Sequence, residues 1–266
     1  MDGMTKGKVI EFTLPIEPLS TKPRTIWVYL PADYDTTEET YPVLYMFDGH
    51  NLFFDELSYA GTSWGIKDYL DNTGTKLIGV GKNCNHEGQE RESEYCPFTP
   101  VKVKGWESTV KKGDITADWF VNTLKPYCEK HFRVSTNRED IGIGGSSMGG
   151  LMGDYMAAKY SDIIGNFACL SPATEFAPKR CLSFIKKQNI HQNTRIYRSF
   201  GSEELRGRRK EMKAIDLLLQ ISNAFIDKRC IVHTKLHVGE QHNEEAWAKL
   251  VPEFIPFLFP DLCHIQ

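Results

Sequence analysis

The sequence predicts an α/β fold, a three-layer α/β/α sandwich in which two layers of helices enclose a mainly parallel sheet. Strand-like segments alternate with helical segments along most of the 266 residues. One of them, residues 42–47, is continuously apolar, which is typical of a strand that is buried on both faces. Repeats, linkers and low-complexity tracts are absent from the sequence, so we expect a single domain over residues 1–266.

The expected elements follow in chain order from the spacing and type of the apolar residues. Strands are expected at residues 9–14, 25–30, 42–47, 76–80, 140–144, 164–170, 195–200 and 231–238. Helices are expected at residues 114–128, 151–160, 205–225 and 243–250, with a further helical turn after Pro252. Residues 81–108 are polar, aromatic and irregular, and they indicate a loop excursion.

Charge, cysteine content and the lack of long apolar runs indicate which binding partners and which cellular compartment to expect. The net charge is −3, with 32 Lys and Arg against 35 Asp and Glu, so no basic excess points to nucleic acid or to an anionic membrane. The seven cysteines are odd in number and show no CxxC spacing. A secretory leader and an apolar run of about 18 residues are both missing from the sequence as given, so we expect a cytoplasmic protein. The sequence leaves open whether the protein forms a homo-oligomer.

The segment GSSMG at residues 145–149 fits the pattern G-x-S-x-G and makes Ser147 the candidate nucleophile. The pattern alone is weak, but this copy lies between an apolar strand and a helix rich in small residues. A sharp turn there would lift the Ser147 hydroxyl above the sheet, and the helix start would offer N–H groups to an oxyanion. The simpler alternative is a serine that only caps the helix. Ser146 is a weaker nucleophile candidate because Met148 stands where its second glycine should be.

A serine nucleophile needs a base, and His242 is the favoured one of eight histidines. His242 follows the last expected strand, whereas His233 and His237 fall inside that strand and His264 lies in the tail. The chain order serine, acid, histidine places the acid after the preceding strand. Glu203 and Glu204 both fit that position, and Glu204 is favoured, while Asp216 falls well inside an expected helix.

The loop after the strand at residues 42–47 is the expected source of one oxyanion-hole donor, the backbone N–H of His50. The second donor is the N–H of Met148, the residue after the nucleophile. Aromatic residues in loop-like stretches are candidates for a substrate pocket: Phe53, Trp64, Tyr95, Phe98 and Trp106.

His50 also invites comparison with a metal site, because Cys84, His86 and Cys96 follow it in the chain. Their spacing matches no established zinc pattern, so we expect no metal and no organic cofactor.

Several segments in the right order give the chain a family resemblance. It resembles the esterase D-like, or putative esterase, branch of the α/β hydrolases, which includes feruloyl, acetyl-xylan and siderophore esterases. The segments that carry the resemblance are residues 41–53 (YPVLYMFDGHNLF), 91–98 (RESEYCPF), 145–150 (GSSMGG), 171–173 (SPA) and 242–247 (HNEEAW). The chain departs from the family where His50 replaces a glutamine and where Glu240 and Gln241 replace two glycines.

The resemblance implies an α/β-hydrolase fold and ester hydrolysis, and it places the acid three residues after Gly201, on Glu204. We therefore expect a serine carboxylic ester hydrolase that acts through an acyl-enzyme on a small or carbohydrate-linked ester of acetyl or feruloyl type. The pocket candidates are then Trp64, Arg91, Glu94 and Tyr95. Two alternatives stay open, an acyltransferase with the same triad and a non-catalytic binding module. A serine peptidase is disfavoured by analogy, because we see no additional domain that would select peptides.

Overall fold

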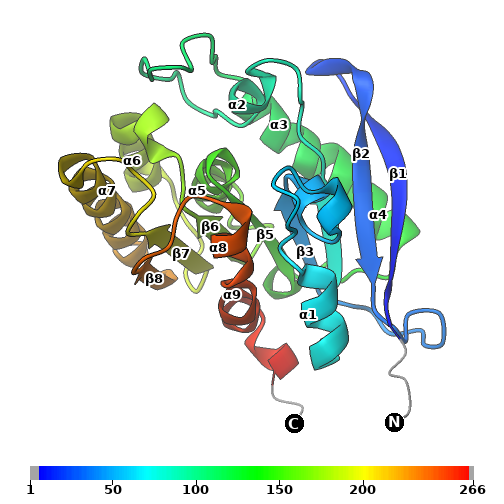
Figure 1. Ribbon diagram of the computed structural model, residues 1–266. Coiled ribbons are helices and arrows are strands. Elements are labelled where there is room, and N and C mark those ends of the chain that lie inside the picture. Colours follow the sequence, from blue (N-terminus) through cyan, green and yellow to red (C-terminus); the bar gives the residue numbers. More distant parts are fainter. Residues whose placement is uncertain (1–5, 264–266) are drawn as a thin grey trace.

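The computed structural model describes residues 6–263, and their strands form one eight-stranded sheet in the order β1-β2-β4-β3-β5-β6-β7-β8 (Figure 1). β1 and β2 are antiparallel, β2 is antiparallel to β4, and the neighbours from β4 to β8 are all parallel. The strands are β1 Lys8–Ile16, β2 Ser20–Leu30, β3 Val43–Phe47, β4 Ile78–Lys82, β5 Ile141–Ser146, β6 Asn166–Leu170, β7 Arg195–Gly201 and β8 Ile231–His237. The mainly parallel sheet is therefore confirmed.

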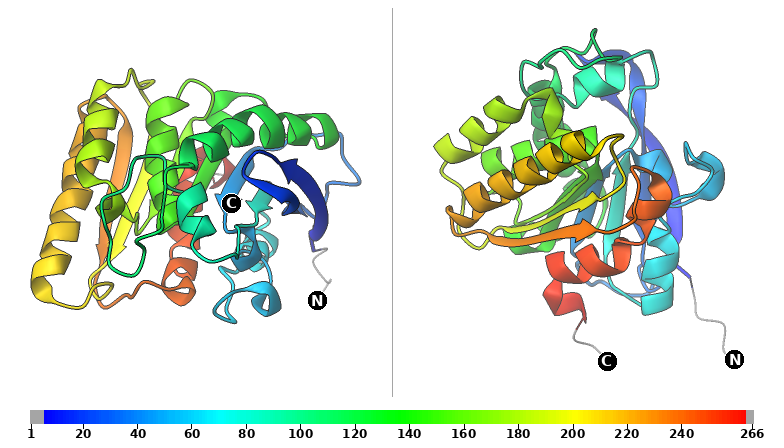
Figure 2. Two further views of the ribbon diagram at one scale, coloured as in Figure 1. Left: turned by 90° about the horizontal axis from the view of Figure 1, so that it is seen from above. Right: turned by 60° about the vertical axis from the view of Figure 1, so that its left-hand side comes forward.

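Helices cover both faces of this sheet, which confirms the three-layer architecture (Figures 1 and 2). One face packs against α3 Gly113–Trp119, a π turn η3 Phe120–Leu124, α4 Lys125–His131, α5 Met148–Lys159, α6 Pro178–Lys187 and α7 Arg208–Ile226. The other packs against α1 Ile66–Thr73, α8 Glu244–Ala248 and α9 Val251–Leu258. The short pieces are α2 Glu90–Glu94 and the 3₁₀ turns η1 Gly49–Asn51, η2 Asp55–Leu57, η4 Arg138–Asp140, η5 Thr174–Phe176 and η6 Pro260–Cys263.

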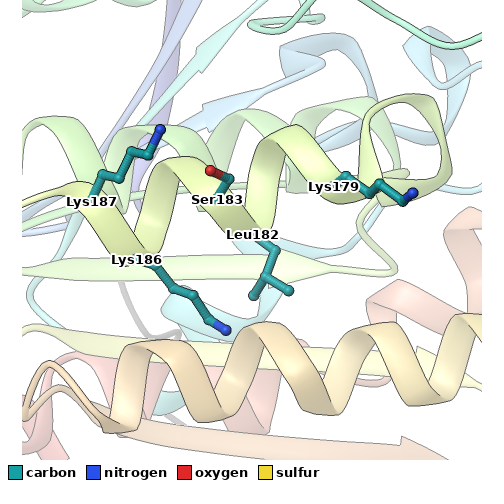
Figure 3. A pocket seen from close by; sticks show the side chains of 5 residues that line it. All are labelled: Lys179, Leu182, Ser183, Lys186 and Lys187. Carbon is teal, nitrogen blue, oxygen red and sulfur yellow. The ribbon is translucent and has the colours of Figure 1, made fainter.

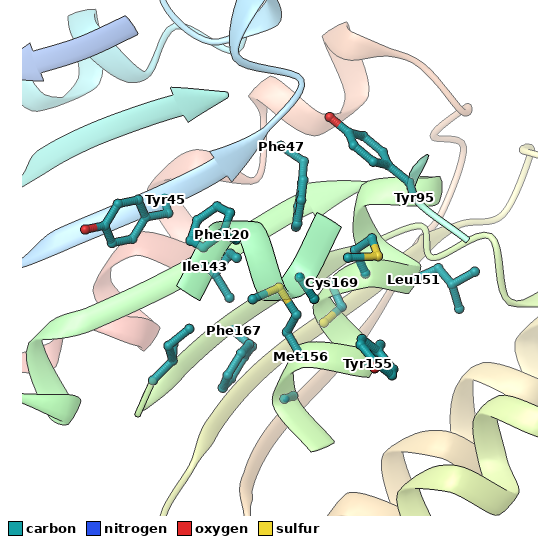
Figure 4. Close-up of a cluster of buried hydrophobic side chains, with 14 of the residues drawn as sticks. Tyr45, Phe47, Tyr95, Phe120, Ile143, Leu151, Tyr155, Met156, Phe167 and Cys169 are labelled. Carbon is teal, nitrogen blue, oxygen red and sulfur yellow. The ribbon is translucent and has the colours of Figure 1, made fainter. Parts of the chain in front are cut away.

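β3 shows why the sheet is buried on both sides. Its alternate side chains Tyr45 and Phe47 enter the core under α3 to α7, where their ring centroids lie 5.1 and 5.9 Å from that of Phe120 (Figure 4). Leu44 and Met46 point to the opposite core, under α1 and α9. Because each fully buried apolar side chain contributes about 1.5–3 kcal/mol, β3 is anchored from both layers.

Helix boundaries near the site differ from the sequence expectation. α5 begins at Met148 rather than at residue 151, directly after Ser147, and α7 begins at Arg208 rather than at residue 205. The loop expected over residues 81–108 contains the short helix α2. Helices α1 and α6 are not anticipated, although α1 starts after Gly65 and ends before Gly74, both in the left-handed region. Of all the described helices, none is long and apolar enough to cross a bilayer.

Candidate active site

Ser147 occupies a sharp turn between β5 and α5, as the G-x-S-x-G pattern predicts. Its backbone angles are φ 58° and ψ −119°, a conformation that costs a non-glycine residue about 1–3 kcal/mol. Two hydrogen bonds hold it there, because the Ser147 N–H donates to Leu170 O at 2.9 Å and the Ala173 N–H donates to Ser147 O at 2.9 Å. The turn is therefore fixed by the end of the neighbouring strand β6, and the Ser147 side chain is left partly exposed.

Glycines around the turn allow the strands and α5 to approach closely. A Cβ atom on Gly149 would lie 3.1 Å from Phe47 Cβ, at the end of β3. A Cβ atom on Gly150 would lie only 2.7 Å from the carbonyl oxygen of Leu170. Side chains at these two positions would push α5 away from the sheet, and Ser147 would move with it.

His242 and Glu204 come from the loops after β8 and β7 and form a close pair. His242 Nδ1 lies 2.6 Å from Glu204 Oε2. The Glu204 side chain is 2% exposed and that of His242 is 37% exposed, so the acid is buried behind an imidazole that solvent can reach. Glu203 is exposed and makes no such contact; its backbone N–H donates to Glu240 O. Sequence left these two glutamates open, and the structure brings Glu204 to the histidine.

Ser171 and Trp247 complete the surroundings of the pair, and neither was assigned a role from the sequence. Ser171 Oγ donates to Glu204 Oε1 at 2.5 Å and accepts a hydrogen bond from Trp247 Nε1 at 2.9 Å. The indole ring of Trp247 also meets the His242 ring edge-on, with centroids 4.9 Å apart. Ser171 and Trp247 lie in the segments 171–173 and 242–247, which carry the family resemblance. The sequence therefore marked these residues but did not show which side chains they contact.

Segment 171–173 links the turn at Ser147 to Glu204. Its Ala173 N–H bonds to the carbonyl of Ser147, and its Ser171 hydroxyl bonds to the carboxylate of Glu204. The three candidate triad residues are thus joined through one short segment after β6. The remaining histidines lie elsewhere: His233 and His237 are in β8, as expected, and His264 is outside the described residues.

The two expected oxyanion donors belong to neighbouring pieces of backbone. Met148 opens α5, in the first turn, where N–H groups have no acceptor within the helix. His50 lies in η1 just beyond β3, after Asp48, which has a positive φ of 56°. The end of β3 abuts the start of α5, since a Cβ atom on Gly149 would be 3.6 Å from Asp48 Oδ2. Burial lowers the pKa of the His50 imidazole, although Asp48 opposes this effect.

Asp48 is in turn fixed by Arg91, one of the residues expected in the pocket. Arg91 Nε and Nη2 donate to the two carboxylate oxygens at 2.8 and 2.7 Å. Burial by itself would raise the pKa of Asp48, but the Arg91 guanidinium outweighs it and the pKa is lowered. Arg91 therefore holds the loop that carries His50.

Glu94 and Tyr95, also expected in the pocket, are fully buried instead. Arg24 Nη2 donates to both oxygens of Glu94 at 2.9 and 3.1 Å, and Lys82 Nζ lies 3.8 Å away. The Tyr95 ring lies under Lys82, 4.7 Å from the ammonium nitrogen. Burial lowers the pKa of Lys82 to about 8, even though Glu94 favours its charge. These side chains form an internal ion-pair cluster, and such a cluster has no free face for substrate.

Trp64 lies beside the triad but is 3% exposed. Its ring centroid is 6.0 Å from that of Trp247, which in turn packs on His242. Trp64 is thus linked to His242 through the ring of Trp247.

A cavity of about 630 Å³ opens next to His242 and Glu204, between η5, the Ser171–Ala173 segment and α7. Its walls include the apolar residues Val103, Pro172 and Leu217, and three lysines line it: Lys104, Lys210 and Lys213. None of the four pocket residues expected from the sequence lines this cavity. A separate hollow runs along α6 and is lined by Lys179, Leu182, Ser183, Lys186 and Lys187, none of which belongs to the triad (Figure 3).

Comparison with known proteins decides the family. Residues 19–258 match the model of a family described as Putative esterase. The chain belongs to this family. The protein is therefore a carboxylic ester hydrolase, and the resemblance drawn from its short segments is confirmed. The matched region includes the turn at Ser147 and the loops that carry Glu204 and His242.

Two relatives illustrate the similarity in sequence, and one of them is itself named an esterase. Uncharacterized protein YbbA of Bacillus subtilis is 22% identical over 250 residues, which cover 89% of the esterase and 92% of YbbA. Esterase MT1326 of Mycobacterium tuberculosis is 31% identical over 144 residues, 54% of the esterase and 27% of the mycobacterial protein. The esterase thus spans about a quarter of that longer protein.

Solved structures show the same fold at low identity. An IroE-like serine hydrolase from Shewanella oneidensis superposes with a TM-score of 0.77 and 18% identity, over 96% of the esterase and 81% of that chain. A ferulic acid esterase gives a TM-score of 0.69 and 18% identity, over 96% and 98% of the two chains. The α/β-hydrolase fold is therefore confirmed.

Proposed function

We propose that the esterase hydrolyses its ester in two steps, with Ser147 as nucleophile, His242 as general base and Glu204 as the residue that orients His242. The observation that carries this proposal is the 2.6 Å contact between His242 Nδ1 and Glu204 Oε2. It engages one ring nitrogen with the buried carboxylate, so the other nitrogen, Nε2, is available to a serine proton. The serine proposed for that role lies in the strained turn before α5.

In the first step, Ser147 Oγ attacks the ester carbonyl carbon while His242 Nε2 takes the hydroxyl proton. The oxyanion that forms is stabilised by the N–H groups of Met148 and His50, each donor being worth about 3–4 kcal/mol in comparable sites. His242 then gives the proton to the leaving alcohol, and Ser147 keeps the acyl group. In the second step, water attacks the acyl-enzyme with help from the same imidazole, and the acid is released.

The cavity beside His242 favours a small or medium-sized ester, of acetyl or feruloyl type and in some cases linked to a carbohydrate. Its volume of about 630 Å³ is in the range of sites for drug-sized ligands. Apolar walls suit an acyl or aromatic group, while the lysines Lys104, Lys210 and Lys213 and the acidic residues Glu175 and Asp216 in the lining suit polar groups such as hydroxyls. The structural likeness to a ferulic acid esterase supports an aromatic acyl group.

Two measurements test this mechanism. A p-nitrophenyl phosphonate should label the intact esterase once, and peptide mass spectrometry should place the label on Ser147. Product analysis with a feruloyl ester should give free acid in water and in low concentrations of added alcohol. Labelling at another residue would contradict the nucleophile, and predominant transfer to dilute alcohol would favour an acyltransferase.

A further inference from the structure

Three side chains with metal-binding donor atoms meet outside the triad, although their spacing in the sequence predicted no metal. His50 lies in η1 after β3, and Cys84 and His86 follow β4, the parallel neighbour of β3. One ligand atom from each of the three residues lies within 4.8 Å of the others. The three residues follow two adjacent strands, so the fold brings together side chains that no spacing in the sequence relates.

His50 presents a nitrogen that the protein leaves unsatisfied. The residue is 9% exposed, and its Nδ1 atom is buried without a hydrogen-bond partner among the described residues. An unpaired buried nitrogen costs about 1–3 kcal/mol, so such atoms are rare without a ligand, an ion or a water. The His50 ring faces His86 edge-on, with the centroids 4.9 Å apart.

His86 is oriented for the same cluster by Asn83. Its Nε2 atom lies 3.1 Å from Asn83 Oδ1, which also accepts the backbone N–H of Cys84 at 2.9 Å. Because an amide oxygen only accepts, this contact places the ring proton on Nε2 and leaves the lone pair of Nδ1 free to bind a metal ion. Cys84 Sγ lies 3.8 Å from Nδ1 and 3.7 Å from Nε2 of this ring. A hydrogen bond on the far ring nitrogen is the usual support of a metal-binding histidine.

We propose that His50, Cys84 and His86 bind one zinc ion. Two imidazoles and one sulfur are donors that suit Zn²⁺, with ligand bonds of about 2.0–2.3 Å and therefore sulfur–nitrogen separations of about 3.5 Å. The separation of 3.8 Å between Cys84 and His86 is close to this value, and the exposed His86 ring can move to close the remainder. On binding, the Cys84 thiol loses its proton to solvent and a thiolate–zinc bond forms. Water completes the fourth position.

This site includes none of the proposed triad residues Ser147, Glu204 and His242. It overlaps the residues proposed for catalysis at His50, whose ring would bind the metal while its backbone N–H is the proposed oxyanion donor. Metal binding can therefore be measured without any ester substrate, and the result does not depend on the proposed function.

The experiment is a titration of the full chain, without a histidine tag, with Co²⁺ and then Zn²⁺. We expect one Co²⁺ per chain, a near-ultraviolet sulfur-to-cobalt charge-transfer band, and loss of that band when Zn²⁺ is added. Cys84→Ser should abolish the band, and His86→Asn should weaken binding at least tenfold. His86 is exposed, so that second variant should fold even if the buried Cys84 position does not tolerate serine.

Matched controls separate this site from adventitious binding. Cys96→Ser replaces another buried cysteine, and His191→Asn replaces another exposed histidine; both variants should bind cobalt as wild type does. Absence of the band in the wild-type protein at micromolar Co²⁺ would overturn the proposal. So would a band that survives in folded Cys84→Ser or binding that is unchanged in His86→Asn.

Discussion

At the residue scale, Glu204 is distinguished from Glu203 by the number of groups that hold its carboxylate. Oε1 accepts hydrogen bonds from the Ser171 hydroxyl and the Gly201 N–H, and Oε2 faces His242 Nδ1. A carboxylate with this many donors is fixed in one orientation, which the proposed role of Glu204 in orienting His242 requires.

Glu204→Gln should therefore lower kcat by on the order of 10³–10⁴-fold, because an amide can hold His242 only in the wrong tautomer. Glu203→Gln is the matched control and should stay close to wild type. Steady-state turnover of p-nitrophenyl acetate by both variants checks this. Equal losses in the two variants, or a larger loss in Glu203→Gln, would remove Glu204 from the mechanism.

Sequence alone could nominate Ser147 as nucleophile and His242 as base, but the spacing did not choose between the two candidates for the acid. Both glutamates follow the same strand, and nothing in their spacing says which one turns inward; the family resemblance supplied the preference. Ser171 and Trp247 could not be given roles, because their contacts with Glu204 and His242 join residues 33 and 5 positions apart through side-chain geometry. Such contacts depend on rotamers that no local pattern encodes.

At the element scale, the position of Ser147 depends on how closely α5 packs on β6. Gly150 faces the Leu170 carbonyl, where a Cβ atom would lie 2.7 Å away. Gly153, one turn later, faces the Cys169 sulfur, where a Cβ atom would lie 2.8 Å away. The backbone oxygen of Leu170 is fixed within its strand, whereas the Cys169 side chain can rotate away from an added methyl group.

Gly150→Ala should thus lower the free energy of unfolding by about 1–3 kcal/mol and reduce kcat, because overpacking displaces the start of α5. Gly153→Ala should have a smaller effect on both quantities. Urea unfolding and ester turnover of the two variants measure this difference. A Gly150→Ala protein as stable and active as wild type would show that α5 does not fix the nucleophile.

Periodicity predicted the strands that carry the site, yet it missed helices α1 and α6. The strands of the parallel sheet are apolar on both faces, so their composition signals burial directly. α1 buries only Ile66, Leu70 and Asp71, which is too narrow a stripe to stand out. Its flanking glycines Gly65 and Gly74 were the available signal.

At the scale of the whole molecule, the Asp48–Arg91 pair ties the chain between β4 and α3 to the end of β3. This excursion was expected only as an irregular loop, because its order comes from buried ion pairs with distant partners rather than from local propensity. The side chains of Asp48 and Arg91 are 5% and 24% exposed. Removing one partner of such a pair leaves a charge that water reaches poorly.

Asp48→Asn should therefore destabilise the esterase by about 2–4 kcal/mol at pH 7. The pKa of Asp48 is lowered in the folded state, so its contribution is complete above the unfolded pKa of about 4 and is lost as the pH falls through the folded value. The stability difference between wild type and variant should narrow below about pH 4. Asparagine tolerates the positive φ of this position, so the backbone is preserved.

Urea unfolding from pH 7 to pH 3 gives this comparison. Asp35→Asn is the control, because it removes an exposed pair with Lys8 and should change stability by less than about 1 kcal/mol at any pH. A difference for Asp48→Asn that is small at pH 7, or that grows towards low pH, would be inconsistent with a stabilising charged pair.

The proposed hydrolysis depends on Ser147 as the nucleophile, and its neighbour Ser146 in β5 provides the control. Turnover of a panel of p-nitrophenyl and feruloyl esters should be measured for wild type, Ser147→Ala and Ser146→Ala. We predict a loss in kcat on the order of 10³-fold or more for Ser147→Ala, and activity close to wild type for Ser146→Ala. Hydrolysis by Ser147→Ala at the wild-type rate would contradict the central claim.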